Sequence, residues 1–86
     1  MKIGYSRSVR KKLKKLDNSI KARIFSYMDE VGELSDPRSR GKALTANLSG
    51  LWRYRVGKYR LVCKIIDSEL VILVVDIAHR KEIYDK

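Results

Sequence analysis

The clearest fold signal in this chain is Leu51-Trp52-Arg53-Tyr54-Arg55-Val56-Gly57-Lys58-Tyr59-Arg60-Leu61-Val62-Cys63. Polar and apolar side chains alternate on both sides of Gly57, which predicts two antiparallel strands joined by a tight turn. A glycine at the first central position of a two-residue loop is typical of a type II′ hairpin turn. With that turn, Arg55 lies directly opposite Arg60, and Arg53 lies opposite Val62.

Three arginines share one face of the predicted hairpin, because successive side chains of a strand point to opposite faces. They are Arg53, Arg55 and Arg60. Like charges directly opposite each other destabilise a sheet by about 0.2–1 kcal/mol. A fold keeps such a pair more readily when an anion binds there, and the candidate anion is a phosphate. The other face carries the side chains that a core needs: Trp52, Tyr54, Val56, Tyr59, Leu61 and Cys63.

Length and charge bound the class of protein. The 86 residues suffice for a single domain, residues 1–86, and the net charge of +10 indicates a polyanionic partner. The longest apolar run, Leu70 to Val75, is far too short to span a membrane, and no signal-peptide pattern is present, so we expect a cytoplasmic protein. The single cysteine, Cys63, excludes an internal disulfide and a cysteine-rich zinc site.

The N-terminal half predicts a short strand at Lys2–Tyr5 and two helices. Ser6 or Ser8 caps the first helix, in which Val9, Leu13 and Leu16 recur at helical spacing. Asp17, Asn18 or Ser19 caps the second helix. Its apolar stripe is wide and is expected to lie in the core: Ile20, Ile24, Phe25, Tyr27, Met28, Val31 and Leu34. The short connection between the helices predicts an antiparallel helical hairpin.

The C-terminal half predicts strands. The irregular segment Ser35–Gly50 is expected to contact the core through Leu44 and Leu48, and strands follow at Leu51–Val56 and Tyr59–Ile66. After a turn at 67–69, Leu70–Ile77 is apolar at nearly every position, as in a strand covered on both faces. The expected fold is α+β: an N-terminal helical hairpin packed on one face of a small, twisted, mainly antiparallel β-sheet.

Basic residues outside the hairpin have two open interpretations, a solvated surface or electrostatic attraction to RNA and the ribosome. A dense run lies in the first helix, and others lie in the irregular segment and at the hairpin tip. The candidates for RNA binding are Lys11, Lys12, Lys15, Arg38, Arg40, Lys42 and Lys58.

Residues 50–61, the apolar strand, and Ala78-His79-Arg80-Lys81-Glu82-Ile83-Tyr84 together resemble the RelE/ParE superfamily of bacterial toxins. Within it the chain is similar to the RelE-type ribosome-dependent mRNA interferases. This resemblance implies the toxin of a type II toxin–antitoxin pair, which cuts messenger RNA in the ribosomal A site. The ribose 2′-hydroxyl attacks the neighbouring phosphate, leaving a 2′,3′-cyclic phosphate, and neither a metal nor another cofactor takes part.

The resemblance also implies roles for residues. Arg53, Arg55, Arg60, Arg80 and Tyr84 match catalytic positions of the branch, and His79 stands where relatives carry a basic or titratable residue. Arginines stabilise the charge that builds on the phosphate oxygens. Some members have lysines at positions 53 and 55, and arginine cannot accept a proton near neutrality. The base is therefore His79 or Tyr84, or the reaction depends more on electrostatics and ribosomal positioning.

The partners implied are a RelB-like cognate antitoxin in a toxin–antitoxin hetero-oligomer, the 70S ribosome and messenger RNA. Asp76 interrupts the last strand and is a candidate ion-pair partner for one arginine. Two alternatives stay open: a ParE-like toxin that inhibits DNA gyrase without nuclease activity, and an inactive toxin.

Overall fold

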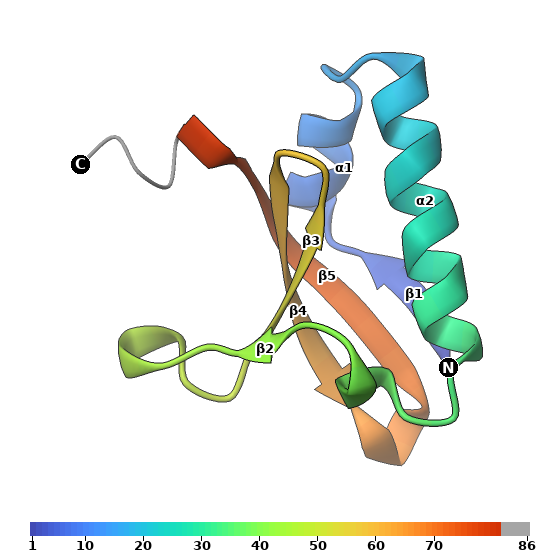
Figure 1. Ribbon diagram of the computed structural model, residues 1–86, viewed down its shortest axis with the longest axis vertical. Helices are drawn as coiled ribbons and strands as arrows, with labels where there is room; N and C mark the ends of the chain where they lie inside the picture. Colours follow the sequence, from blue (N-terminus) through green and yellow to red (C-terminus); the bar gives the residue numbers. More distant parts are fainter. Residues whose placement is uncertain (82–86) are drawn as a thin grey trace.

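A computed structural model describes residues 1–81 and shows two helices on one face of a five-stranded sheet (Figure 1). The strand order is β1-β5-β4-β3-β2, and every neighbouring pair is antiparallel except β1 and β5. The predicted α+β fold is therefore confirmed. The elements are β1 (Lys2–Tyr5), α1 (Arg7–Leu13), α2 (Asn18–Glu33), β2 (Lys42–Ala43), β3 (Trp52–Val56), β4 (Tyr59–Ile66) and β5 (Val71–His79), with 3₁₀ turns at Pro37–Ser39, Ala46–Leu48 and Asp67–Glu69.

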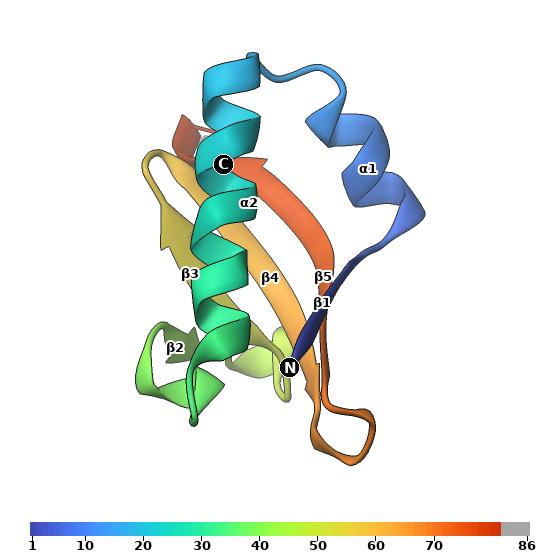
Figure 2. The same cartoon turned by 90° about the vertical axis from the view of Figure 1, so that its right-hand side faces the viewer.

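The core lies between the helices and the sheet, as the apolar patterns predict. Val9 and Leu13 of α1 and Ile24, Met28 and Val31 of α2 are buried against the strands. The strands contribute Tyr54, Val56, Leu61, Cys63, Ile72, Val74 and Ile77. Figure 2 shows α2 crossing the same face of β3 and β4 along most of its length.

Two residues predicted for this core do not belong to it. Leu34, just after α2, is half-buried but does not pack against the core cluster. Phe25 is the other. Its side chain is 39% exposed and meets the ring of Tyr5 edge-on, with 5.2 Å between the ring centroids. Each residue advances about 100° around a helix, so Phe25 lies well to one side of the stripe that contains Ile24.

α1 covers the part of β5 that β1 leaves unpaired. Ser6 caps the helix, since its Oγ accepts a hydrogen bond from the backbone N–H of Val9 at 3.3 Å. The Ser6 backbone N–H donates to the Val74 carbonyl at 3.0 Å, and Lys12 Nζ donates to the Ile77 carbonyl at 3.1 Å. These bonds satisfy part of a strand edge that would otherwise be open to pairing with another chain.

The central hairpin has the predicted register. Arg55 is the cross-strand partner of Arg60, and Arg53 is that of Val62. Gly57 has a φ of +58°, and Lys58 has no positive φ, in agreement with a type II′ turn. The side chain of Tyr54 is fully buried on the helix side, so the arginines on the alternate positions are directed to the uncovered side.

The last strand differs from the prediction at both ends. β5 runs from Val71 to His79, whereas Leu70 lies in the preceding turn with a φ of +55° and is 64% exposed. The register with β4 shifts beside Cys63: Val62 pairs with Asp76, and Cys63 pairs with Val74. Val75 is therefore an extra residue, a β-bulge that places Val74 and Ile77 in the same core despite their odd spacing.

The irregular segment is tied to the sheet by two aromatic side chains. Tyr54 Oη donates to the Pro37 carbonyl at 2.6 Å, and Trp52 Nε1 donates to the Arg40 carbonyl at 2.7 Å. The core contact predicted for Leu44 and Leu48 is wrong: both are half-buried, but neither packs against the core cluster. In Figure 1 the chain that follows β2 extends away from the sheet.

Candidate nucleic-acid interface

The face of the sheet opposite the helices carries the arginines of the central hairpin, and we call it the arginine face. Cross-strand partners share a face, so the register defines two rows of side chains across it. One row contains Lys42, Arg53, Val62 and Asp76 from β2, β3, β4 and β5. The next row contains Arg55, Arg60 and Ala78. The predicted cluster of Arg53, Arg55 and Arg60 therefore exists as one patch.

Two guanidinium donors of the arginine face are buried and, within residues 1–81, lack an acceptor. They are the Nε atoms of Arg53 and Arg60. A buried donor without an acceptor costs about 1–3 kcal/mol. An oxyanion bound at this face would supply the missing acceptors, and arginine binds phosphate with several donors at once.

Arg55 occupies the outer edge of the patch. It is exposed, and with Arg53, Lys42, Gly41 and Tyr27 of α2 it lines a cavity of about 230 Å³. β2 is only two residues long, so β3 becomes an edge strand beyond Arg53. The arginine face therefore continues around that edge toward α2.

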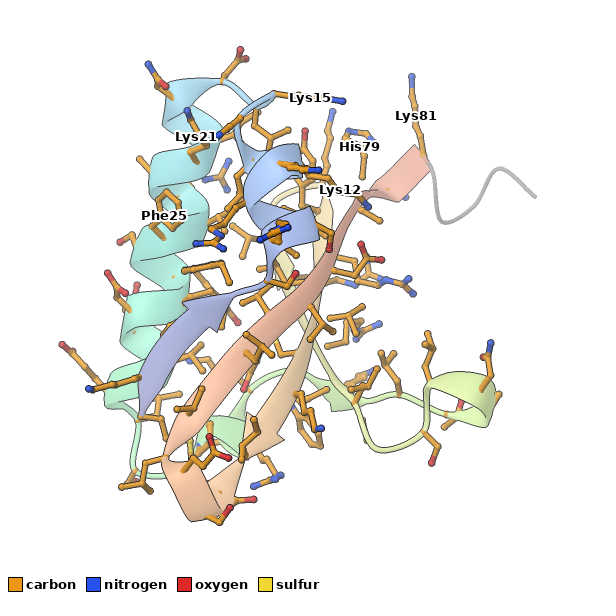
Figure 3. All side chains as sticks on the ribbon, turned by 180° about the vertical axis from the view of Figure 1, so that it is seen from behind. Lys12, Lys15, Lys21, Phe25, His79 and Lys81 are labelled. Atoms are coloured by element: carbon orange, nitrogen blue, oxygen red, sulfur yellow. The ribbon has the colours of Figure 1, made fainter. Side chains whose placement is uncertain are left out.

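Asp76 is a carboxylate on the arginine face, and its partner is not an arginine. Its Oδ1 accepts a hydrogen bond from Lys12 Nζ of α1 at 2.9 Å. Figure 3 shows Lys12 on the side of α1 that faces β5. The predicted pairing of Asp76 with an arginine is therefore wrong, because Lys12 reaches past the unpaired edge of β5 to the carboxylate.

His79 lies on the opposite face from the arginines. It pairs with Tyr59, whose ring centroid is 5.1 Å from that of His79 in an edge-on contact. Its Nδ1 accepts a hydrogen bond from the Lys81 backbone N–H at 3.1 Å. The ring lines a cavity of about 310 Å³ between α2 and the hairpin tip, together with Ile20, Arg23, Val56, Gly57, Lys58 and Tyr59.

The structure therefore does not bring His79 to the arginine face. The sequence prediction ended the last strand at Ile77, but β5 continues to His79, and alternation directs that ring to the helix side. Arg80 follows directly, and its backbone N–H donates to the Lys58 carbonyl at 2.6 Å. Tyr84 lies outside the described residues.

The predicted RNA-binding residues do not form one surface. Lys42 joins the arginine face, because it pairs with Arg53. Arg38 forms a two-pronged pair with Asp67 at 2.9 and 3.0 Å, and Arg40 contacts Glu30 at 3.5 Å. These internal pairs reduce the positive charge available to RNA. The remaining residues lie on α1 and its C-terminal turn or at the hairpin tip: Lys11, Lys12, Lys15 and Lys58.

Sequence reasoning missed one cation of the arginine face, Lys64. It lies on β4 two alternations beyond Arg60 and is exposed. Alternate residues of a strand share a face, so extending the series Arg60, Val62 by one more step would have identified Lys64.

Within residues 1–81, the other titratable groups do not form a second site. The guanidinium of Arg38 holds the pKa of the Asp67 carboxyl below its usual value. Burial raises the pKa of the Cys63 thiol to about 12, so this cysteine is a core side chain rather than a nucleophile. Among residues 1–81 there is no group of three His, Cys, Asp or Glu side chains that could hold a metal ion, and no helix there is long and apolar enough to cross a membrane.

Comparisons with known proteins agree with this architecture. The family model described as ParE toxin of type II toxin–antitoxin system, parDE, matches residues 3–84. Over 83 residues the chain is 31% identical to Toxin RelG of Mycobacterium tuberculosis, covering 95% of this chain and 93% of RelG. Fold and sequence thus define a toxin of a type II toxin–antitoxin system.

Solved structures give the same result. The M. tuberculosis toxin–antitoxin complex RelBE2 matches with a TM-score of 0.80 and 30% identity, over 92% of this chain and 90% of that one. The isolated Escherichia coli RelE toxin shares the fold, with a TM-score of 0.73 and 20% identity over 98% and 90% of the two chains. The protein belongs to the RelE/ParE superfamily of type II toxins.

Proposed function

We propose that this toxin is a ribosome-dependent endoribonuclease that cleaves messenger RNA in the A site. The observation that carries the proposal is the arginine face, in which Arg55 opposes Arg60 and the Nε donors of Arg53 and Arg60 have no acceptor within the described chain. The similarity of this chain to RelG and to the toxin of the RelBE2 complex supports the same activity. Such an enzyme acts in the cytoplasm, where the ribosomes are.

The chemistry follows from the charge on this face. Attack by a ribose 2′-oxygen on the adjacent phosphorus places negative charge on the non-bridging phosphate oxygens. In this proposal Arg53, Arg55 and Arg60, which the strand register brings onto one face, stabilise that charge. One preorganised donor is typically worth about 10²–10³ in rate. Arg80 and Tyr84 are further candidates, from the resemblance of residues 78–84 to the family.

RNA and ribosome binding use the surplus of positive charge. Lys42 and Lys64 extend the arginine face on β2 and β4, and the net charge is +10. Contacts to the phosphate backbone supply affinity without sequence preference, and the ribosome would place the codon.

A cognate antitoxin is the expected protein partner. The RelBE2 match is a toxin–antitoxin complex, and so is the intact E. coli RelBE complex among the similar structures. An antitoxin segment with acidic residues that covers the arginine face would block RNA and form a toxin–antitoxin hetero-oligomer.

A second function has one observation in its favour, because the matching family model is named for ParE. In that alternative the protein inhibits DNA gyrase and cuts no RNA. A gyrase inhibitor has no need for paired phosphate-binding arginines, so the arginine face favours the nuclease.

Mapping the 5′ ends of cellular transcripts after induction separates the two functions. The nuclease predicts new ends at fixed positions within codons, lost in Arg60→Met and kept in Arg7→Met, which removes the same charge from the exposed N-terminus of α1. DNA damage with intact transcripts would contradict the nuclease and support the gyrase inhibitor.

A further inference from the structure

The arginine face can stabilise a phosphate, but a 2′-hydroxyl attack also needs a group that accepts the hydroxyl proton. We propose that this acceptor is the carboxylate of Asp76. The inference rests on the proposed nuclease function and adds a catalytic residue to it.

Several other titratable groups of residues 1–81 are poorly placed for this role. Arginines hold their protons at neutral pH. His79 and Tyr59 lie on the helix side of the sheet, and Tyr54 is buried there. Glu30 is on α2 and contacts Arg40. Across β2, β3, β4 and β5, Asp76 is the one carboxylate whose register places it on the arginine face.

The position of Asp76 fits a phosphate held by the arginines. It is the cross-strand partner of Val62, whose other partner is Arg53, so Asp76 and Arg53 flank one buried apolar residue. Neighbouring strands are about 4.8 Å apart, which separates these two backbones by roughly 10 Å. Arg60 is the diagonal neighbour of Asp76, at a typical distance of about 7–8 Å between Cα atoms.

A β-bulge immediately before Asp76 gives it this orientation. Because Val75 is an extra residue, Val74 and Ile77 both stay in the core while Asp76 faces the arginines. Bulges often redirect a side chain beside an active site. Without the bulge, Asp76 and Val74 would fall on the same face, and either the core or the arginine face would be disrupted.

Lys12 orients the carboxylate and leaves part of it available. Its ammonium contacts Oδ1 at 2.9 Å and also donates to the Ile77 carbonyl, which fixes it against the strand. Within the described chain Oδ2 has no hydrogen-bond partner, and 45% of the side chain is exposed. A substrate hydroxyl can therefore approach Oδ2.

The proton of the ribose 2′-hydroxyl moves to Asp76 Oδ2 while the 2′-oxygen bonds to phosphorus. The bond from phosphorus to the 5′-oxygen breaks, and that oxygen takes a proton from water. Asp76 then returns its proton to solvent, which leaves the 2′,3′-cyclic phosphate and the 5′-hydroxyl.

The test is single-turnover cleavage of messenger RNA on programmed ribosomes at saturating toxin. Asp76→Asn is expected to lower the rate by about 10²–10⁴-fold, as for loss of a general base, with ribosome affinity unchanged. Lys12→Met removes the ion pair but keeps the carboxylate, so its rate is expected to fall less than tenfold. Formate should restore part of the activity of Asp76→Ala, because a free carboxylate can replace the missing one.

An Asp76→Asn rate within threefold of the wild type overturns the assignment and leaves the nuclease function intact. Equal losses in Asp76→Asn and Lys12→Met, without rescue by formate, show that Asp76 only tethers α1 and also overturn it. If the wild type does not cut, the nuclease proposal itself fails. Thermal melting of each variant separates loss of activity from loss of folding.

Discussion

The hydroxyl groups of Tyr54 and Tyr5 lead to opposite predictions for the same substitution, tyrosine to phenylalanine. Tyr54 Oη is buried and donates to the Pro37 carbonyl at 2.6 Å. Tyr5 Oη is also buried, but it has no partner within residues 1–81. Burial raises the pKa of both phenols, that of Tyr5 to about 12.

The structure gives the size of each effect. Tyr54→Phe removes a hydrogen bond and leaves the Pro37 carbonyl without a partner, so the free energy of unfolding should fall by about 1–3 kcal/mol. In a domain of this size, each kcal/mol lost from the free energy of unfolding lowers Tm by about 4–8 °C. Tyr5→Phe removes a buried hydroxyl without a partner and should raise the free energy of unfolding, by up to about 1–2 kcal/mol.

Urea unfolding, followed by the fluorescence of the single tryptophan, Trp52, measures both changes. Tyr27→Phe is the matched control: its ring contact with Tyr54, at 6.1 Å between centroids, is retained, so the change should stay within about 0.5 kcal/mol. A Tyr5→Phe variant destabilised as much as Tyr54→Phe would contradict the difference between the two hydroxyl groups.

Three further predictions concern other parts of the chain. Gly41→Ala should lower the free energy of unfolding by more than about 2 kcal/mol in urea, because Gly41 has a φ of +76° and an added Cβ would meet the Arg53 carbonyl. Gly50→Ala is the control: Gly50 also has a positive φ but has open space around it, so only the backbone strain of about 1–2 kcal/mol is expected. The folded-state pKa of Cys63 is raised from 9.0 to about 12, so its contribution to stability is complete below pH 9 and is lost as the pH rises toward 12. In Cys63→Ala, the free energy of unfolding should therefore fall less steeply with pH between pH 9 and 12, by at most about 1.4 kcal/mol per pH unit. A slope equal to that of the wild type would contradict this prediction. Lys64→Ala should reduce the salt dependence of RNA binding by about 0.7 in the slope of log affinity against log salt, a change that filter binding detects.

The hairpin and its arginines were predictable because the signals are local. Gly57 fixes the turn, the turn fixes the register, and strict alternation then assigns each side chain to a face. The helices followed from apolar spacing in the same way. Phe25 shows the limit of that spacing, since a residue at the border of a stripe can be exposed.

The rest of the site depends on contacts that sequence does not encode locally. The bulge at Val75 changes the parity of β5, which moves His79 to the helix side and Asp76 to the arginine face. The ion pair of Lys12 with Asp76 joins residues 64 positions apart, and that of Arg38 with Asp67 spans 29 positions. Only the packing of α1 and of the irregular segment brings these partners together.

The most direct test of the arginine face is the rate at which Arg60→Met cleaves messenger RNA on programmed ribosomes. With ribosome binding saturated, we expect a rate about 10²–10³-fold below that of the wild type, while Arg7→Met, which removes the same charge from α1, keeps the wild-type rate. Equal rates for Arg60→Met and the wild type would contradict the claim that the arginine face stabilises the reacting phosphate.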